Sequence, residues 1–262
     1  MASKREERER RRRERLAAEQ AAAGSERRRM FLGYAVAGLI VAAIVVGIVI
    51  AVTGGGDGDS ADGSGEYPEL AYVQPELGVV PDGIELDGRE GIPPPEPQNA
   101  VLEESAAAGG CELQLDLRDE GSTHFTDEDR QVDYETSPPT SGDHYGDPAE
   151  VLSGALADGA YLETPPITRA VHSLEHGRVE IQYSPDLPER EQLEIKGVFE
   201  ESPEGVLLFP NPDMTYDVAI TAWRDLAGCE AYEGAATLDL LRAFRDTFRG
   251  DGPEDIPLSV AP

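Results

Sequence analysis

The stretch that decides the fold runs from Ile167 to Tyr183 and reads I-T-R-A-V-H-S-L-E-H-G-R-V-E-I-Q-Y. Apolar residues in its first half recur at the i, i+3, i+4, i+7 spacing of a short amphipathic helix: Ile167, Ala170, Val171 and Leu174. Gly177 is a typical helix terminator. Val179–Tyr183 then alternates apolar and polar residues, which predicts a strand with one face exposed. We therefore expect a helix that turns directly into a strand.

The residues that follow predict the rest of one domain. Residues 188–201 and 236–248 have helical spacing, whereas 206–209 and 218–223 are short apolar runs typical of buried strands. The resulting order of strand, helix, strand, strand, helix predicts an α+β domain on a mostly antiparallel sheet. We place this globular domain at residues 106–252.

The four histidines of the chain all lie within about fifty residues of one another, at His124, His144, His172 and His176. In a helix, His172 and His176 are four residues apart and share one face, so that they can hold one cation. The loop Pro138–Tyr145 has two prolines and a glycine that can aim His144 into a cleft. This clustering predicts a transition-metal site for copper or zinc, built from His144, His172, His176 and His124.

Two other interpretations of the histidines stay open. His172 and His176 can be structural, bonding backbone carbonyls at the end of a helix, in which case the domain is a non-enzymatic interaction module of the cell envelope. Alternatively, Glu175 is the candidate for a catalytic acid or base in a metal-assisted hydrolase. The letters H-x-x-E-H occur in inverted zinc peptidases, but those need a long helix, and here Gly177 and a strand follow at once.

The N-terminal third predicts a membrane anchor. Residues 1–30 are rich in arginine and precede Phe31–Val52, which has no charged residue in a span long enough to cross a bilayer. The positive-inside rule places residues 1–30 in the cytoplasm and the remainder outside the cell membrane, as a single-pass signal anchor. Residues 53–105 are rich in Gly, Pro and acidic residues, which predicts a disordered linker.

Charge and cysteines narrow the function further. The formal net charge is −30, from 22 basic and 52 acidic residues, which argues against nucleic acid as a partner. The acidic excess fits either a saline habitat or a generic acidic exterior. Cys111 and Cys229 fall in the segment predicted to be extracytoplasmic, where we expect a disulfide, although two buried thiols are the alternative.

Three motifs also resemble a known family. Residues 138–145 (P-P-T-S-G-D-H-Y), 171–179 (V-H-S-L-E-H-G-R-V) and 221–223 (T-A-W, shortly before Cys229) are similar to the bacterial and archaeal family catalogued as domain of unknown function 3105. The resemblance extends over about residues 109–250. It implies a secreted or singly anchored domain, but no reaction and no identified partner. His144, His172, Glu175, His176 and Gly177 match the family pattern, and Asp143 departs from it.

Overall fold

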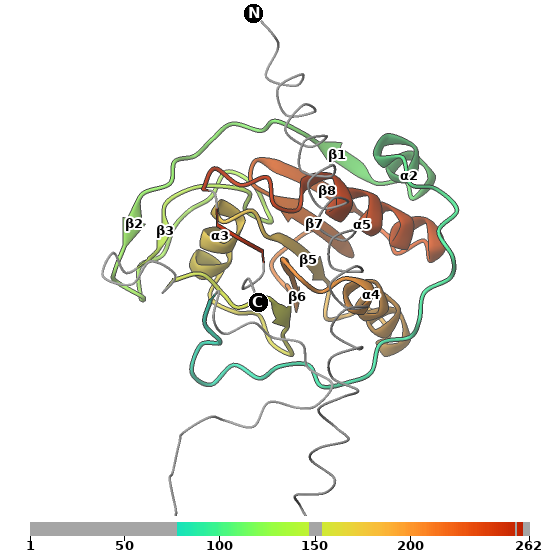
Figure 1. Cartoon of the computed structure of the whole chain (residues 1–262), viewed down its shortest axis with the longest axis horizontal. Helices are drawn as coiled ribbons and strands as arrows, with labels where there is room; N and C mark the ends of the chain where they lie inside the picture. Colours follow the sequence, from blue (N-terminus) through green and yellow to red (C-terminus); the bar gives the residue numbers. More distant parts are fainter. Residues whose placement is uncertain (1–77, 147–153, 255, 259–262) are drawn as a thin grey trace, which may run out of the picture. The chain divides into compact units, whose positions relative to one another are not determined.

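The computed structural model describes residues 78–146, 154–254 and 256–258, and these form one domain around a six-stranded sheet (Figure 1). The strand order is β1-β8-β7-β5-β6-β4. The strands are β1 (Glu112–Gln114), β4 (Gly159–Ala160), β5 (Val179–Tyr183), β6 (Val206–Pro210), β7 (Val218–Ala222) and β8 (Asp225–Cys229). The predicted cytoplasmic tail, the span at residues 31–52 and the linker up to residue 77 lie outside the described residues. No helix in the described part of the chain is both long enough and apolar enough to cross a membrane.

The pairing of the strands confirms an α+β domain on a mostly antiparallel sheet. Neighbouring strands in the row β1, β8, β7 and β5 pair antiparallel, whereas β6 is parallel to both β5 and β4. Four helices accompany the sheet in the described residues: α2 (Leu102–Ala108), α3 (Ile167–Glu175), α4 (Glu189–Glu201) and α5 (Ala235–Phe248). The predicted helices and strands from residue 179 onward agree with α4, α5, β5, β6 and β7 to within one or two residues.

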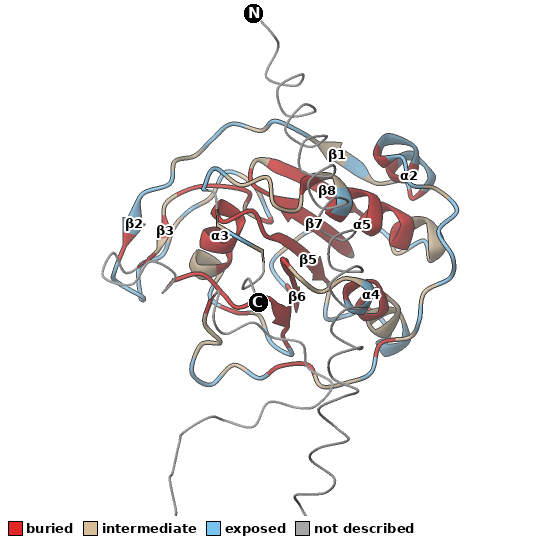
Figure 2. Ribbon diagram, in the orientation of Figure 1, coloured by how far each residue is buried: buried red, intermediate tan, exposed pale blue. Residues whose placement is uncertain are grey.

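One face of the sheet carries the main hydrophobic core beneath α4 and α5 (Figure 1). Val179, Ile181 and Tyr183 point into this core because alternate residues of a strand share a face. The other face of the sheet is also covered, and every residue of β5 is buried (Figure 2). The expectation of a half-exposed strand at 179–183 is therefore wrong. The apolar residues of the alternating pattern face the hydrophobic core, and the polar residues face a second buried layer instead of solvent.

Helix α3 lies against the second face, and a small two-stranded ribbon, β2 (His124–Phe125) and β3 (His144–Tyr145), lies beside α3 (Figure 1). Val171 and Leu174 of α3 pack with Trp223, which follows β7. Helix α3 ends where the predicted helix does, and Gly177 adopts φ +78, which a residue with a side chain rarely adopts. This layer holds the histidines.

Residues 78–105 differ from the predicted disordered linker. Val79 and Leu86 form β-bridges with Leu156 and Tyr161, and Ile92 N donates a 2.8 Å hydrogen bond to Leu193 O. The last four of these residues begin α2. The low hydrophobicity of the segment is compatible with order because neighbouring elements satisfy its backbone groups, so that it needs no core of its own.

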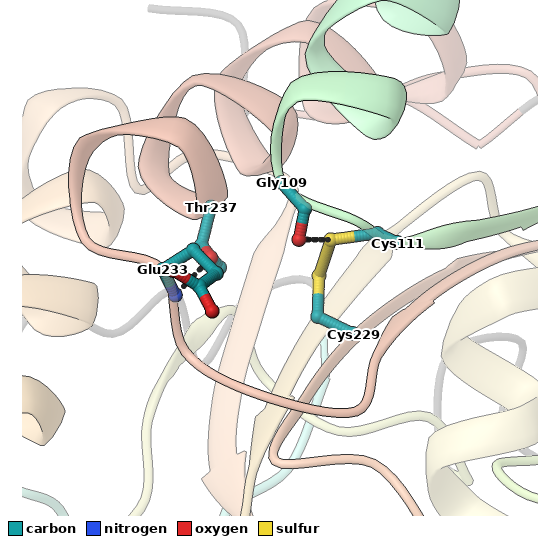
Figure 3. Close-up of a disulfide and its surroundings, with 5 residues drawn as sticks. All are labelled: Gly109, Cys111, Cys229, Glu233 and Thr237. Carbon is teal, nitrogen blue, oxygen red and sulfur yellow. Dashed lines mark hydrogen bonds between the residues drawn. A yellow bond between two sulfur atoms is a disulfide. The ribbon is translucent and has the colours of Figure 1, made fainter.

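A disulfide joins two neighbouring strands at one edge of the sheet (Figure 3). Cys111, between α2 and β1, bonds to Cys229 at the end of β8 with an S–S distance of 2.06 Å. Shortly after Cys229, Thr237 Oγ1 in the first turn of α5 accepts the backbone N–H of Glu233 at 2.9 Å. The predicted disulfide is thus confirmed.

Candidate metal centre

The β2–β3 ribbon places two histidines side by side. The two strands pair in parallel, with His124 opposite His144 and Phe125 opposite Tyr145. Two backbone bonds hold the register, from His144 N to Thr123 O at 3.1 Å and from Gly146 N to Phe125 O at 2.9 Å. Because paired residues of neighbouring strands point to the same face, both imidazoles project together.

Helix α3 supplies the other two side chains of the cluster. His172 and Glu175 are three residues apart and therefore adjacent on the helix surface. The ring of His172 lies 4.7 Å, centroid to centroid, from the rings of His124 and His144. His144, His172 and Glu175 are buried, whereas the side chain of His124 retains 36 % of its exposure. The cluster thus lies at the edge of the domain, with one ligand facing solvent.

Four potential ligand atoms converge within this cluster. His124 Nε2 lies 3.1 Å from His144 Nε2, 3.3 Å from His172 Nε2 and 3.4 Å from Glu175 Oε2. His144 Nε2 is 3.0 Å from Glu175 Oε2, and all four atoms are within 4.8 Å of one another. Ligands that surround Zn²⁺ in a tetrahedron at its usual bond lengths are roughly 3.3 Å apart. The spacing therefore fits a single small cation.

Backbone carbonyls orient two of the imidazoles. His144 Nδ1 lies 2.9 Å from Gly142 O, and His172 Nδ1 lies 2.8 Å from Tyr145 O. A carbonyl only accepts, so each Nδ1 carries the proton and each Nε2 of a neutral ring presents its lone pair to the centre. Metal-binding histidines are oriented in this way in proteins.

The four converging atoms have few hydrogen-bond donors among them. With His144 and His172 in the neutral form, only His124 can bring an N–H to the four converging atoms. Burial lowers the pKa of His172 to about 2, and the neighbouring imidazoles reinforce this, so that ring stays neutral. Within the described residues, Glu175 Oε2 is buried without a hydrogen-bond partner.

Two glycines make room for the rings. A Cβ at Gly146 would lie 2.1 Å from Cδ2 of His124, and a Cβ at Gly154 would lie 2.5 Å from Nδ1 of His172. Neither distance is possible between non-bonded atoms, so both positions require glycine. Their role emerges only once the imidazoles are placed, and nothing in the local sequence indicates it.

His176 lies beside this cluster but directs its nitrogens elsewhere. Its ring centroid is 4.5 Å from that of His172, yet its ligand atom groups with Glu175 and Glu254 rather than with the other imidazoles. The structure thus divides the predicted His172–His176 pair, and Glu175 takes the place expected for His176. Glu175, three residues after His172, lies closer to the ribbon. His176, four residues after His172, is the C-cap of α3 and turns toward the C-terminal segment.

Glu254 is the functional candidate that sequence reasoning missed. It lies some eighty residues from the histidine motif, beyond the predicted end of the domain, in a run of acidic and small residues with no periodicity. Only the contact of the C-terminal segment with α3 reveals it.

Comparison with known proteins agrees with the resemblance of the histidine motifs. A family model described as a protein of unknown function, DUF3105, matches residues 125–256, half of the chain. No curated protein and no solved structure matches. The matched segment includes every member of both carboxylate–imidazole groups except His124, which lies one residue before it. The chain belongs to the DUF3105 family.

Proposed function

We propose that this domain is a metal-binding module that holds one zinc ion between His124, His144, His172 and Glu175. The observation that carries the proposal is the convergence of four acceptor atoms, with distances of 3.0–3.4 Å at the measured edges and at most one N–H among the neutral rings. Lone pairs so close repel each other, and a divalent cation at their centre turns this repulsion into coordination.

The shape of the group favours zinc over copper(II). In a square-planar site each ligand atom faces one other ligand across the metal, at roughly 4 Å. His124 Nε2 has all three partners at 3.1–3.4 Å, so no ligand lies opposite it. The absence of an opposite ligand at His124 favours a tetrahedral site, the geometry that zinc adopts with imidazole and carboxylate ligands, over a square-planar one.

A site with four protein ligands supports binding rather than catalysis. Catalytic zinc sites keep one position for water or substrate, whereas structural sites are closed by protein. Glu175 contributes an oxygen to the ligand group, which removes it from the role of a free acid or base. A hydrolase at this centre is therefore the less supported alternative.

We further propose that the domain acts outside the cell membrane, anchored by residues 31–52. Support comes from the uncharged span behind an arginine-rich segment and from the disulfide, a bond typical of oxidising compartments. The envelope partner, if the module delivers or senses metal, is then another extracytoplasmic protein.

Elemental analysis tests the zinc proposal. The full chain is purified without a metal-affinity column or chelator, exposed to zinc and dialysed. We expect bound zinc in the wild type, loss of the tightly bound ion from the double variant His144→Ala with His172→Ala, and a large loss of affinity in Glu175→Gln. Glu180→Gln is the matched control, because it removes another buried carboxyl group outside the cluster and keeps the ion.

The competing interpretation, structural histidines in a non-enzymatic envelope domain, draws on the carbonyl bonds of His144 and His172. It predicts that both histidine changes lower the melting temperature while a chelator leaves the wild type unchanged. A wild type that retains no zinc after dialysis, or a double variant that retains the wild-type amount, would overturn our proposal.

A further inference from the structure

His176 is a buried imidazole that lacks a hydrogen-bond partner within the described residues. It is 1 % exposed, and neither of its ring nitrogens makes a hydrogen bond to the described residues. Buried polar atoms in folded proteins are nearly always paired, so an orphaned ring indicates a ligand that completes it. Nε2 of this ring points toward a carboxylate, with Glu254 Oε2 at 3.3 Å.

The backbone holds Glu254 in this position. Gly250 N donates to Gly177 O at 2.7 Å, and Glu254 N donates to Glu175 O at 3.2 Å, so the C-terminal segment is bonded to the end of α3. A Cβ at Gly252 would lie 2.3 Å from Glu175 O, which shows how closely the two backbones approach. The carboxylate of Glu254 is thus aimed at His176 by main-chain contacts.

We propose that Glu175, His176 and Glu254 form a second cation site, and that Glu175 bridges it to the first, giving a dinuclear centre. One nitrogen and two carboxylate oxygens lie within 4.8 Å of one another in this second group. Glu175 belongs to both groups, and its two oxygens allow it to serve two ions at once. The inference rests on the proposed zinc site, because the bridging carboxylate is positioned there.

The two sites differ in access to solvent. The first has four protein ligands, three of them buried, whereas the second has three, and the side chain of Glu254 keeps 44 % of its exposure. Three protein ligands leave a position for water or another small ligand, as at catalytic zinc sites. The nearby guanidinium of Arg178 is neutralised by Asp158, whose Oδ1 accepts from Nε at 3.0 Å. The second ion therefore binds more weakly and exchanges with solvent.

Equilibrium titration of the full chain with zinc, after removal of metal by chelator, tests this inference. We expect two ions in the wild type, with affinities at least tenfold apart. His176→Ala and Glu254→Gln each lose only the weaker ion, and Glu175→Gln weakens both. Asp251→Asn is the matched control: it removes one carboxylate from the same C-terminal segment, outside the ligand groups, and keeps both ions.

The outcomes separate this inference from the proposed function. The wild type could bind a single ion that is lost in the His144→Ala, His172→Ala variant and kept in Glu254→Gln. That result overturns the second site and leaves the first. No ion in the wild type overturns both. Because Glu254 is partly exposed, its glutamine variant tests the site without disturbing the core, and an unchanged melting temperature in chelator verifies that the fold is intact.

Discussion

Glu180 is a buried acid with no cation beside it among the described ion pairs. It lies on β5, on the face of the sheet turned away from α4 and α5. Its Oε2 accepts from Gln182 Nε2 at 3.0 Å and from Thr221 Oγ1 at 3.5 Å. Its Oε1 has no hydrogen-bond partner in the described residues. Burial raises the pKa of Glu180 to about 8 in the folded state, whereas the unfolded chain titrates near 4.5.

This difference predicts a pH-dependent gain in stability for Glu180→Gln. The folded wild type binds the proton more tightly than the unfolded chain, so its stability falls as pH rises from about 4.5 to about 8 and is then level. Glutamine mimics the protonated acid and does not titrate. The variant should match the wild type near pH 4.5 and exceed it by on the order of a few kcal/mol at pH 8 and above.

Urea unfolding at pH 4.5, 6 and 8.5 measures the effect as the difference between the two proteins, in which the titration of all other groups cancels. If the difference in unfolding free energy between variant and wild type does not change with pH, Glu180 is ionised in the folded protein.

At the scale of elements, one buried ion pair joins three parallel strands at their starts. Asp158 precedes β4, Arg178 precedes β5 and Gly205 precedes β6. Asp158 Oδ1 accepts from Arg178 Nε at 3.0 Å, and Oδ2 accepts from Gly205 N at 2.7 Å. Both charged side chains are essentially inaccessible to solvent. Burial raises the pKa of Asp158, and the guanidinium and the N–H oppose this.

Removal of this carboxylate should be costly. Asp158→Ala leaves the Arg178 charge buried without compensation, and we expect a loss of about 3–5 kcal/mol in the free energy of unfolding. Arg190→Ala is the control, since the Arg190–Glu194 pair is exposed and its loss should cost less than about 1 kcal/mol. Urea midpoints at neutral pH compare the two, and equal losses would contradict a structural role for Asp158.

The elements also show which parts of the fold local sequence can predict. Helices α3, α4 and α5 and strands β5 to β7 are long enough for their apolar spacing to be read. Strands β2, β3 and β4 are two residues long and carry no periodicity, so only their partners define them. The convergence of His124 with His144 depends on that short ribbon. The closeness of the four histidines along the chain made a histidine cluster predictable. Its division between two groups, with Glu254 in the second, was not predictable, because it depends on contacts between distant segments.

At the scale of the whole molecule, the proposed anchor makes a separate prediction. The full chain should remain in the membrane fraction after an alkaline carbonate wash, and protease added to intact cells should cleave it beyond residue 52. Replacing Val45 and Val46 by arginine places two charges in the span and should release the chain, whereas leucine at both positions should not. Recovery of the wild type in the soluble fraction would contradict the anchor.

The Cys111–Cys229 bond has a mechanical consequence. It closes a covalent ring that contains β2, β3 and α3, and with them His124, His144, His172 and Glu175, while α5 and Glu254 follow outside it. When the chain is pulled by its two ends, the load passes from sulfur to sulfur and bypasses everything within the ring. A force on the C-terminal end would separate Glu254 from His176 and leave the four-ligand group unstrained. The force would therefore release the ion of the second site before the ion of the first.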